Sequence, residues 1–72
     1  MITSEQLDNW FRYHAPVADQ STRYARIRDA AREFARVIVE HTPEGDDQTR
    51  AIQKLRESVM LANASIACHG PM

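Results

Sequence analysis

Residues 24–38 read YARIRDAAREFARVI and establish the helical character of the chain. Apolar side chains recur there at alternating steps of three and four positions, the spacing of a helix seam that packs against another helix. The seam residues are Tyr24, Ile27, Ala31, Phe34 and Ile38. Working outward from this stretch, we predict a long helix over about residues 18–41, with Asp19 or Ser21 available as its N-cap.

A second long helix follows a turn. Residues 42–47 read TPEGDD, and a proline, a glycine and two aspartates in so short a stretch signal a break in the helix. Asp46 or Asp47 can cap the next helix, which we expect over about residues 47–68, with Gly70-Pro71 as its stop. Its apolar residues repeat the same rhythm at Ile52, Leu55, Val59, Ala62 and Ile66. Two long helices with a short connection should pack antiparallel as an αα-hairpin.

A short helix is expected before the hairpin, over about residues 4–13. Thr3 can cap it, and Gln6 stands where the partner residue of a capping box belongs. Pro16 disfavours helical backbone at the residue before it, so this helix should stop near Tyr13 or His14. The predicted fold class is therefore all-α: a short N-terminal helix followed by a long antiparallel hairpin, in a single domain over residues 1–72.

The chain is small for a protein that folds alone. With 72 residues it buries little surface per residue, and its one cysteine, Cys68, excludes an intrachain disulfide. Each long helix carries an apolar stripe wider than one neighbouring helix can cover. Trp10, Phe11, Met60 and Leu61 are left short of partners in a lone hairpin. We therefore expect the hairpin to assemble into a helical oligomer.

The composition argues against several classes of function. A formal net charge of −1 disfavours a general DNA- or RNA-binding protein. The chain has no glycine-rich phosphate loop, no nucleophile elbow and no Cys/His cluster with metal-ligand spacing, so we expect no catalysis, cofactor or bound metal. The N-terminus lacks a signal-peptide pattern, and no apolar run reaches the roughly 18–20 residues of a membrane span. These features predict a cytoplasmic protein that does not enter a membrane.

Two regions could bind a small anion. Tyr13 and His14 stand where the short helix should stop, and exposed flat rings can stack on nucleotide bases. Arg28 follows a seam residue near the same junction, and a ring beside a guanidinium is a minimal site for a base attached to a phosphate. The alternative is that the arginines of this helix form a solvated face paired with nearby acids. On the third helix, Arg56 and Asn63 would suit a second polar pocket, although the simpler role for Asn63 is a bond across a subunit interface.

Four segments carry a resemblance to a known family: DNWFRYHAP at 8–16, YARIRDAA at 24–31, DQTRAI at 47–52 and LRESVMLANASIAC at 55–68. They resemble the small phage proteins that contain the helical-hairpin domain of the anti-CBASS cyclic-oligonucleotide sponges. The anti-Thoeris sponges share a related hairpin. The similarity extends over nearly the whole chain, and Val17-Ala18-Asp19 departs from the Thr-Pro-Glu opening expected of close relatives.

The resemblance implies a hexamer of hairpins that holds cyclic dinucleotides in pockets shared by two protomers, sequestering the ligand without cleaving it. Some members also hold cyclic trinucleotides at separate sites. Tyr13 matches the residue that stacks on a base, and Arg28 matches a basic residue that contacts a phosphate. Arg56 and Asn63 match the second type of pocket. The candidate ligand-binding residues are Tyr13, His14, Pro16, Tyr24, Arg28, Arg56 and Asn63. The competing interpretation is a structural or assembly protein of phage or prophage origin that binds a protein partner.

Overall fold

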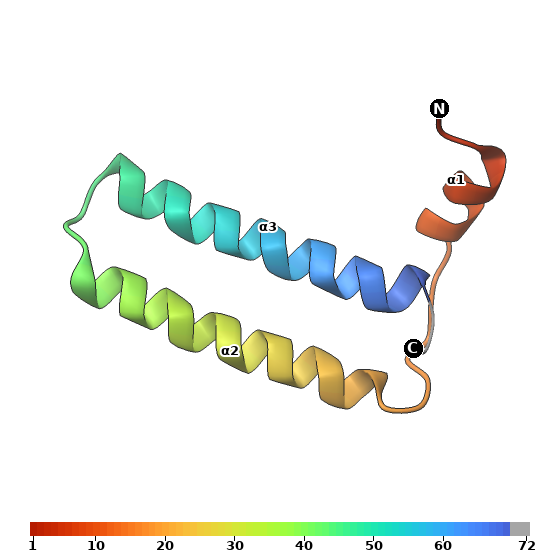
Figure 1. The fold of residues 1–72 in the computed structure, drawn as a ribbon, viewed down its shortest axis with the longest axis horizontal. Helices are drawn as coiled ribbons and strands as arrows, with labels where there is room; N and C mark the ends of the chain where they lie inside the picture. The colour runs from red at the N-terminus through yellow and green to blue at the C-terminus, as the bar shows by residue number, and fades with distance from the viewer. Residues whose placement is uncertain (70–72) are drawn as a thin grey trace.

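The computed structural model describes residues 1–69, and within them every regular element is a helix. α1 covers Ser4–Trp10, α2 covers Gln20–His41 and α3 covers Asp46–Cys68. The two long helices lie side by side as an antiparallel hairpin, and α1 sits beyond the C-terminal end of α3 (Figure 1). The all-α prediction is confirmed. The predicted stop at Gly70-Pro71 lies outside the described residues.

The capping box of α1 is confirmed, but the helix ends earlier than its sequence predicts. Thr3 Oγ1 accepts from the Gln6 amide at 3.1 Å, and Gln6 Oε1 accepts from the Thr3 amide at 2.8 Å. The helix ends at Trp10 and not near Tyr13 or His14. In a longer helix the Asn9 carbonyl would accept from the Tyr13 amide; here a ring nitrogen, His14 Nε2, lies 2.6 Å from that oxygen. Since a carbonyl only accepts, the imidazole must donate, and it occupies the acceptor that the Tyr13 amide would use in a longer helix.

The starts of the two long helices also differ from the predicted caps. Asp19 occupies the N-cap position of α2 but makes no side-chain capping bond; its carboxylate pairs with Arg23 Nε at 3.3 Å. The N-cap of α3 is Gly45, and Asp46 and Asp47 lie in the first turn, where negative charge is favourable beside the helix dipole. The prediction that an aspartate caps α3 is therefore wrong. Gly45 has φ 155° and ψ −176°, a conformation essentially restricted to glycine.

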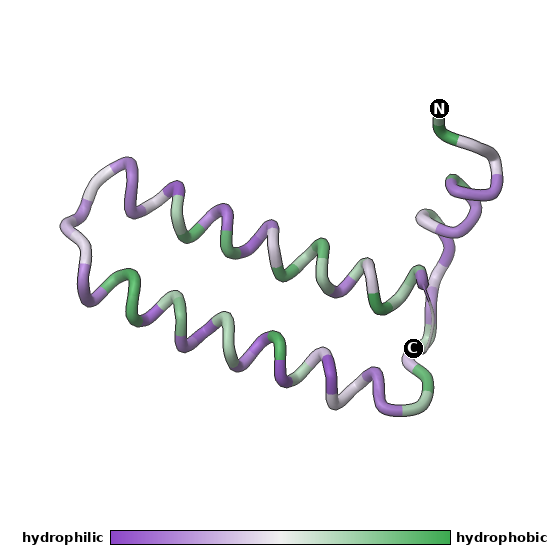
Figure 2. Tube along the Cα trace, in the orientation of Figure 1, coloured by the Kyte–Doolittle hydropathy of each residue, from purple (hydrophilic) through white to green (hydrophobic). Residues whose placement is uncertain are grey.

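The hairpin is one layer of helices with a thin core. Hydrophobic positions recur along both long helices (Figure 2), and in the described part of the chain Ile66, at 9% exposure, is the one apolar residue that is buried. Nine of the ten predicted seam residues are at least half-buried, while Phe34 remains exposed. The molecule measures 44 × 31 × 16 Å. Its radius of gyration of 15.3 Å exceeds the roughly 11 Å of a compact domain of this length. No helix in residues 1–69 is both long and apolar enough to cross a bilayer.

Candidate functional site

A hollow of about 520 Å³ lies at the open end of the hairpin. It is bounded by the linker, which we define as residues 11–19, by the start of α2 and by the end of α3. These segments meet because the antiparallel hairpin brings the first turns of α2 beside the last turns of α3. We call it the linker hollow; its lining is Tyr13, His14, Pro16, Tyr24, Arg28, Asn63, Ala64 and Ala67. Six of the seven candidate residues therefore surround one space.

The linker supplies the aromatic wall of the hollow. His14 is tied back to the Asn9 carbonyl through its ring, and Asn9 Nδ2 donates to the Cys68 carbonyl at 2.8 Å. These bonds join the linker, α1 and the last turn of α3. Tyr13, beside the anchored His14, is 85% exposed, so its ring is free to stack on a ligand or a neighbouring chain.

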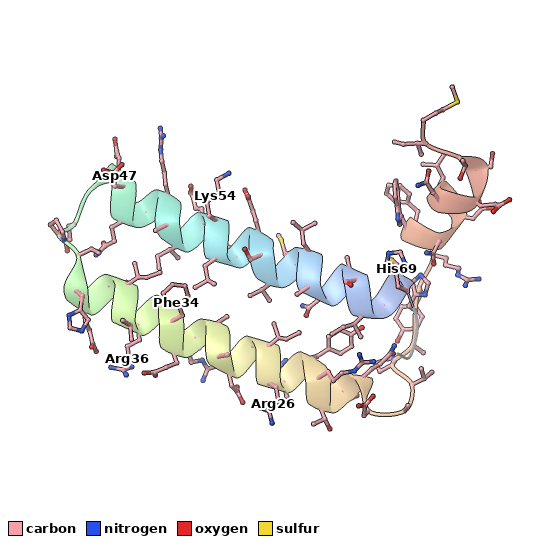
Figure 3. The ribbon with its side chains drawn as sticks, viewed as in Figure 1. Arg26, Phe34, Arg36, Asp47, Lys54 and His69 are labelled. Atoms are coloured by element: carbon pink, nitrogen blue, oxygen red, sulfur yellow. The ribbon has the colours of Figure 1, made fainter. Side chains whose placement is uncertain are left out.

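The positive charge of the hollow comes from Arg28. Among residues 1–69, Arg28 forms no ion pair, whereas Arg36 pairs with both Glu33 and Glu40. Hydrogen bonds from Arg36 lower the pKa of the Glu33 carboxyl, and the bonds to Glu33 and Glu40 raise the pKa of Arg36. Arg26 and Arg36 lie on the side of α2 that faces away from α3 (Figure 3). The solvated-face interpretation therefore fits Arg36, while Arg28 keeps its charge available at the hollow.

Asn63 contributes an unused acceptor. Its Oδ1 atom is buried and has no hydrogen-bond partner in the described residues. A buried amide oxygen without a hydrogen-bond donor lowers the stability of the fold by about 1–3 kcal/mol, so we expect a donor to reach Asn63 in the functional assembly. Both roles predicted for Asn63 supply such a donor: the edge of a base in a ligand, or a side chain across a subunit interface.

Arg56 lies elsewhere. It lines a groove of about 350 Å³ between the middle parts of α2 and α3, together with Arg28, Ala31, Arg32, Ala35, Ile52, Leu55, Val59 and Met60. We call this the arginine groove. Arg56 and Asn63 line different hollows, so the second polar pocket predicted from their spacing stays a prediction.

The sequence did not point to Ala64 and Ala67 as part of the site. Their small side chains leave the space that Tyr13 and Arg28 border, and in the sequence they look like ordinary members of the apolar stripe. Asn9, which holds the linker, also carried no local signal, because its bond reaches a carbonyl 59 positions away.

The arrangement suits binding and offers no obvious chemistry. His14 Nε2 bonds the Asn9 backbone carbonyl. In the described part of the chain, no nucleophilic side chain is hydrogen-bonded to the His14 ring. Nor do residues 1–69 contain a group of three or more His, Cys, Asp or Glu side chains able to hold a metal ion. What remains is a stacking ring, a free guanidinium and an unpaired amide around one space, the components of a site for a flat anionic molecule.

Comparison with known proteins identifies the family. Neither the curated proteins nor the solved structures include a match to this chain. The family model described as Acb2/Tad1, hairpin domain, matches residues 3–67, nearly the whole chain. That family consists of binding proteins rather than enzymes. The chain therefore belongs to the Acb2/Tad1 hairpin-domain family, the family of the anti-CBASS and anti-Thoeris sponges.

Proposed function

We propose that this protein binds and sequesters cyclic dinucleotide second messengers in the host cytoplasm, without cleaving them, and so blocks CBASS-type antiviral signalling. The observation that carries the proposal is the linker hollow, where the exposed ring of Tyr13 and the unpaired guanidinium of Arg28 border one space in a member of the sponge family. Sequestration requires affinity and abundance and needs no catalytic group.

The symmetry of a cyclic dinucleotide matches a site that two protomers form together. A cyclic dinucleotide carries two phosphates and two bases related by an approximate two-fold axis. Two protomers related by a two-fold axis would offer Tyr13 twice and Arg28 twice, one set for each half of the ligand. Each ring can stack on a base, worth about 1–3 kcal/mol, while each guanidinium meets a phosphate.

Self-association is part of the proposal. A lone hairpin leaves large apolar side chains in water, among them Phe11 at 81% exposure and Leu61 at 71%. Covering such surface drives association, and the open linker hollow gains its missing wall from a second copy. We expect the hexamer that the family resemblance implies. A cyclic trinucleotide site would then draw on Arg56 and Asn63, which line different hollows of one chain.

The competing function is that of an assembly protein that binds a protein partner. The same exposed Phe11 and Leu61 favour it, because a partner protein could cover them as well as a second copy could. It differs from the sponge proposal in one respect that can be measured: it predicts no response to any cyclic nucleotide.

The test begins with light scattering after size exclusion, followed by thermal shift against a panel of cyclic di- and trinucleotides. A sponge should be an oligomer whose melting temperature rises with at least one ligand, and heat should release that ligand chemically intact. Tyr13→Ala should reduce the shift, and Arg28→Glu should remove it. Arg26→Glu is the matched control, since Arg26 is exposed on the outer side of α2. A folded oligomer that responds to no ligand would favour the assembly protein, and recovery of an altered ligand would contradict sequestration.

A further inference from the structure

One polar side chain is enclosed although it lines no part of the linker hollow. Gln20, the first residue of α2, is 3% exposed and is the one buried polar residue in the described part of the chain. A buried amide is retained only where its hydrogen bonds are made inside the protein. Its partners therefore indicate what it does.

Gln20 bonds in two directions. Towards the linker, the side-chain Oε1 of Gln20 accepts from the Val17 backbone amide at 2.9 Å, and the Gln20 backbone amide donates to the Val17 carbonyl at 3.0 Å. Towards α3, its Nε2 donates to the Ile66 carbonyl at 3.2 Å. Ile66 is in the last turn of α3, where carbonyls have no acceptor role within the helix. Gln20 thus joins the end of the linker to the end of α3.

The segment that Gln20 holds is strained. Ala18, directly after Val17, has φ 50°, in the left-handed region that L residues with a Cβ avoid. A turn of this kind persists only where its surroundings fix it. The paired bonds between Val17 and Gln20 do so on the α2 side, and the bond to Ile66 anchors the turn on α3.

The other end of the linker is held in the same way. Asn9 Nδ2 donates to the Cys68 carbonyl, and the Asn9 carbonyl accepts from the His14 ring. Tyr13 and Pro16 therefore belong to a stretch fixed at both ends, and both anchors terminate on carbonyls in the last turn of α3.

We infer that Gln20 is a positioning residue for the linker hollow: without touching the ligand, it docks the linker on α3 and sets where Tyr13 and Pro16 stand opposite Arg28. This inference rests on the proposed function for its effect on ligand binding, and on geometry alone for its effect on the linker.

The chain contains a matched control at the opposite end of the hairpin. Gln48 Nε2 donates to the Thr42 carbonyl at 3.1 Å and to Thr42 Oγ1 at 3.0 Å. It is also a glutamine early in a helix that reaches back to the preceding turn. It lines neither the linker hollow nor the arginine groove.

The experiment compares Gln20→Met with Gln48→Met, since methionine keeps the length of the side chain and removes its hydrogen bonds. Gln20→Met should weaken cyclic dinucleotide binding about tenfold, as expected for the loss of one to two hydrogen bonds, while Gln48→Met should change it less than about twofold. Amide exchange followed by NMR should accelerate at Val17 in Gln20→Met only. Wild-type affinity in Gln20→Met, or an unchanged Val17 exchange rate, would overturn the inference.

A double-mutant cycle separates positioning from general loss of structure. If Gln20 acts by placing Tyr13, the effect of Gln20→Met on affinity should shrink in a Tyr13→Ala background; an equal effect in both backgrounds would contradict positioning. Should Gln20→Met fail to fold, Gln20→Asn keeps a neutral amide that is one methylene too short to bond both the Val17 amide and the Ile66 carbonyl, and it should show the same pattern with a smaller loss. If the wild type binds no cyclic nucleotide, the proposed function fails, and the Val17 exchange rate still decides whether Gln20 holds the linker.

Discussion

The two ends of the hairpin are closed by similar chemistry over very different distances in sequence. At the turn end, Gln48 binds Thr42, six positions away, and Thr42 Oγ1 donates to the Ile38 carbonyl at 2.7 Å. At the linker end, Gln20 and Asn9 reach carbonyls 46 and 59 positions away. The turn end has only to reverse the chain. The linker end brings three parts of the chain around one space, and six of the seven candidate binding residues line it.

The largest expected contrast between the two ends is in ligand affinity. Arg28→Glu at the linker end should weaken cyclic dinucleotide binding by about 100-fold or more, because it removes a charge-assisted bond to phosphate and adds repulsion. Arg50→Glu, an equal change of charge near the turn end, should leave affinity within about twofold. Isothermal titration at fixed ionic strength measures both. Equal losses would show that net charge, and not the linker hollow, governs binding.

The next contrast concerns backbone strain at the turn end. Gly45→Ala should lower the free energy of unfolding by about 1–3 kcal/mol, because φ 155° with ψ −176° is unfavourable for any residue with a Cβ. An added Cβ would meet no atom within 4 Å, so steric overlap with neighbours contributes nothing to this effect. Chemical denaturation at one fixed protein concentration measures the change, since an oligomer's stability depends on concentration. A neutral result would mean that the turn relaxes to another conformation.

At the linker end, a substitution to glycine is expected to stabilise the protein, because Ala18 has a positive φ. Ala18→Gly should raise the free energy of unfolding by about 0.5 kcal/mol, since relief of the left-handed strain at φ 50° outweighs the extra freedom of glycine in the unfolded chain. Ala30→Gly, in the middle of α2, is the control and should be destabilising by about 0.5–1 kcal/mol. If both substitutions destabilise equally, the strain at Ala18 is absent in solution.

The smallest effect is expected from the exposed ion pairs between the two ends. The pKa of Glu33 is lowered by its hydrogen bond to Arg36, so the folded state binds the proton less readily than the unfolded state. The resulting stability is present above the ordinary pKa of 4.5 and is lost as pH falls through the lowered value. The small difference in melting temperature between wild type and Arg36→Gln should therefore disappear in acid. A difference that persists at low pH would have another origin, such as lost packing of the arginine stem.

Local patterns predicted what depends on local contacts. The seams of α2 and α3 and the Thr3–Gln6 capping box follow from spacings of three and four residues, and the structure confirms them. The antiparallel hairpin then brings Tyr13 and Arg28 to one hollow, and it also places there Asn63, which its spacing had assigned to a second pocket with Arg56. Two local predictions failed: α1 ends at Trp10, with the Asn9 carbonyl bonded to the His14 ring, and Gly45 takes the N-cap position expected of an aspartate.

Long-range contacts were beyond the reach of sequence patterns. Gln20 looks like an ordinary residue beside the predicted cap Asp19, and its burial arises only when α3 returns to place the Ile66 carbonyl beside it. Arg56 and Asn63 share a helix face by spacing, yet the groove between the helices separates them into different hollows. Which side chains surround a space depends on the neighbouring helix as much as on the helix that carries them.

The thickness of the molecule has a consequence for dosage. At 16 Å, the hairpin is little thicker than one helix with its side chains, so it has almost no interior of its own. If neighbouring copies supply further burial, as proposed, folding is coupled to the number of chains present. Doubling the expression of such a protein is expected to more than double the amount in its assembled form near the association midpoint. Under the proposed function, sequestration of the host's cyclic nucleotide would then rise steeply once the protein concentration passes the association midpoint.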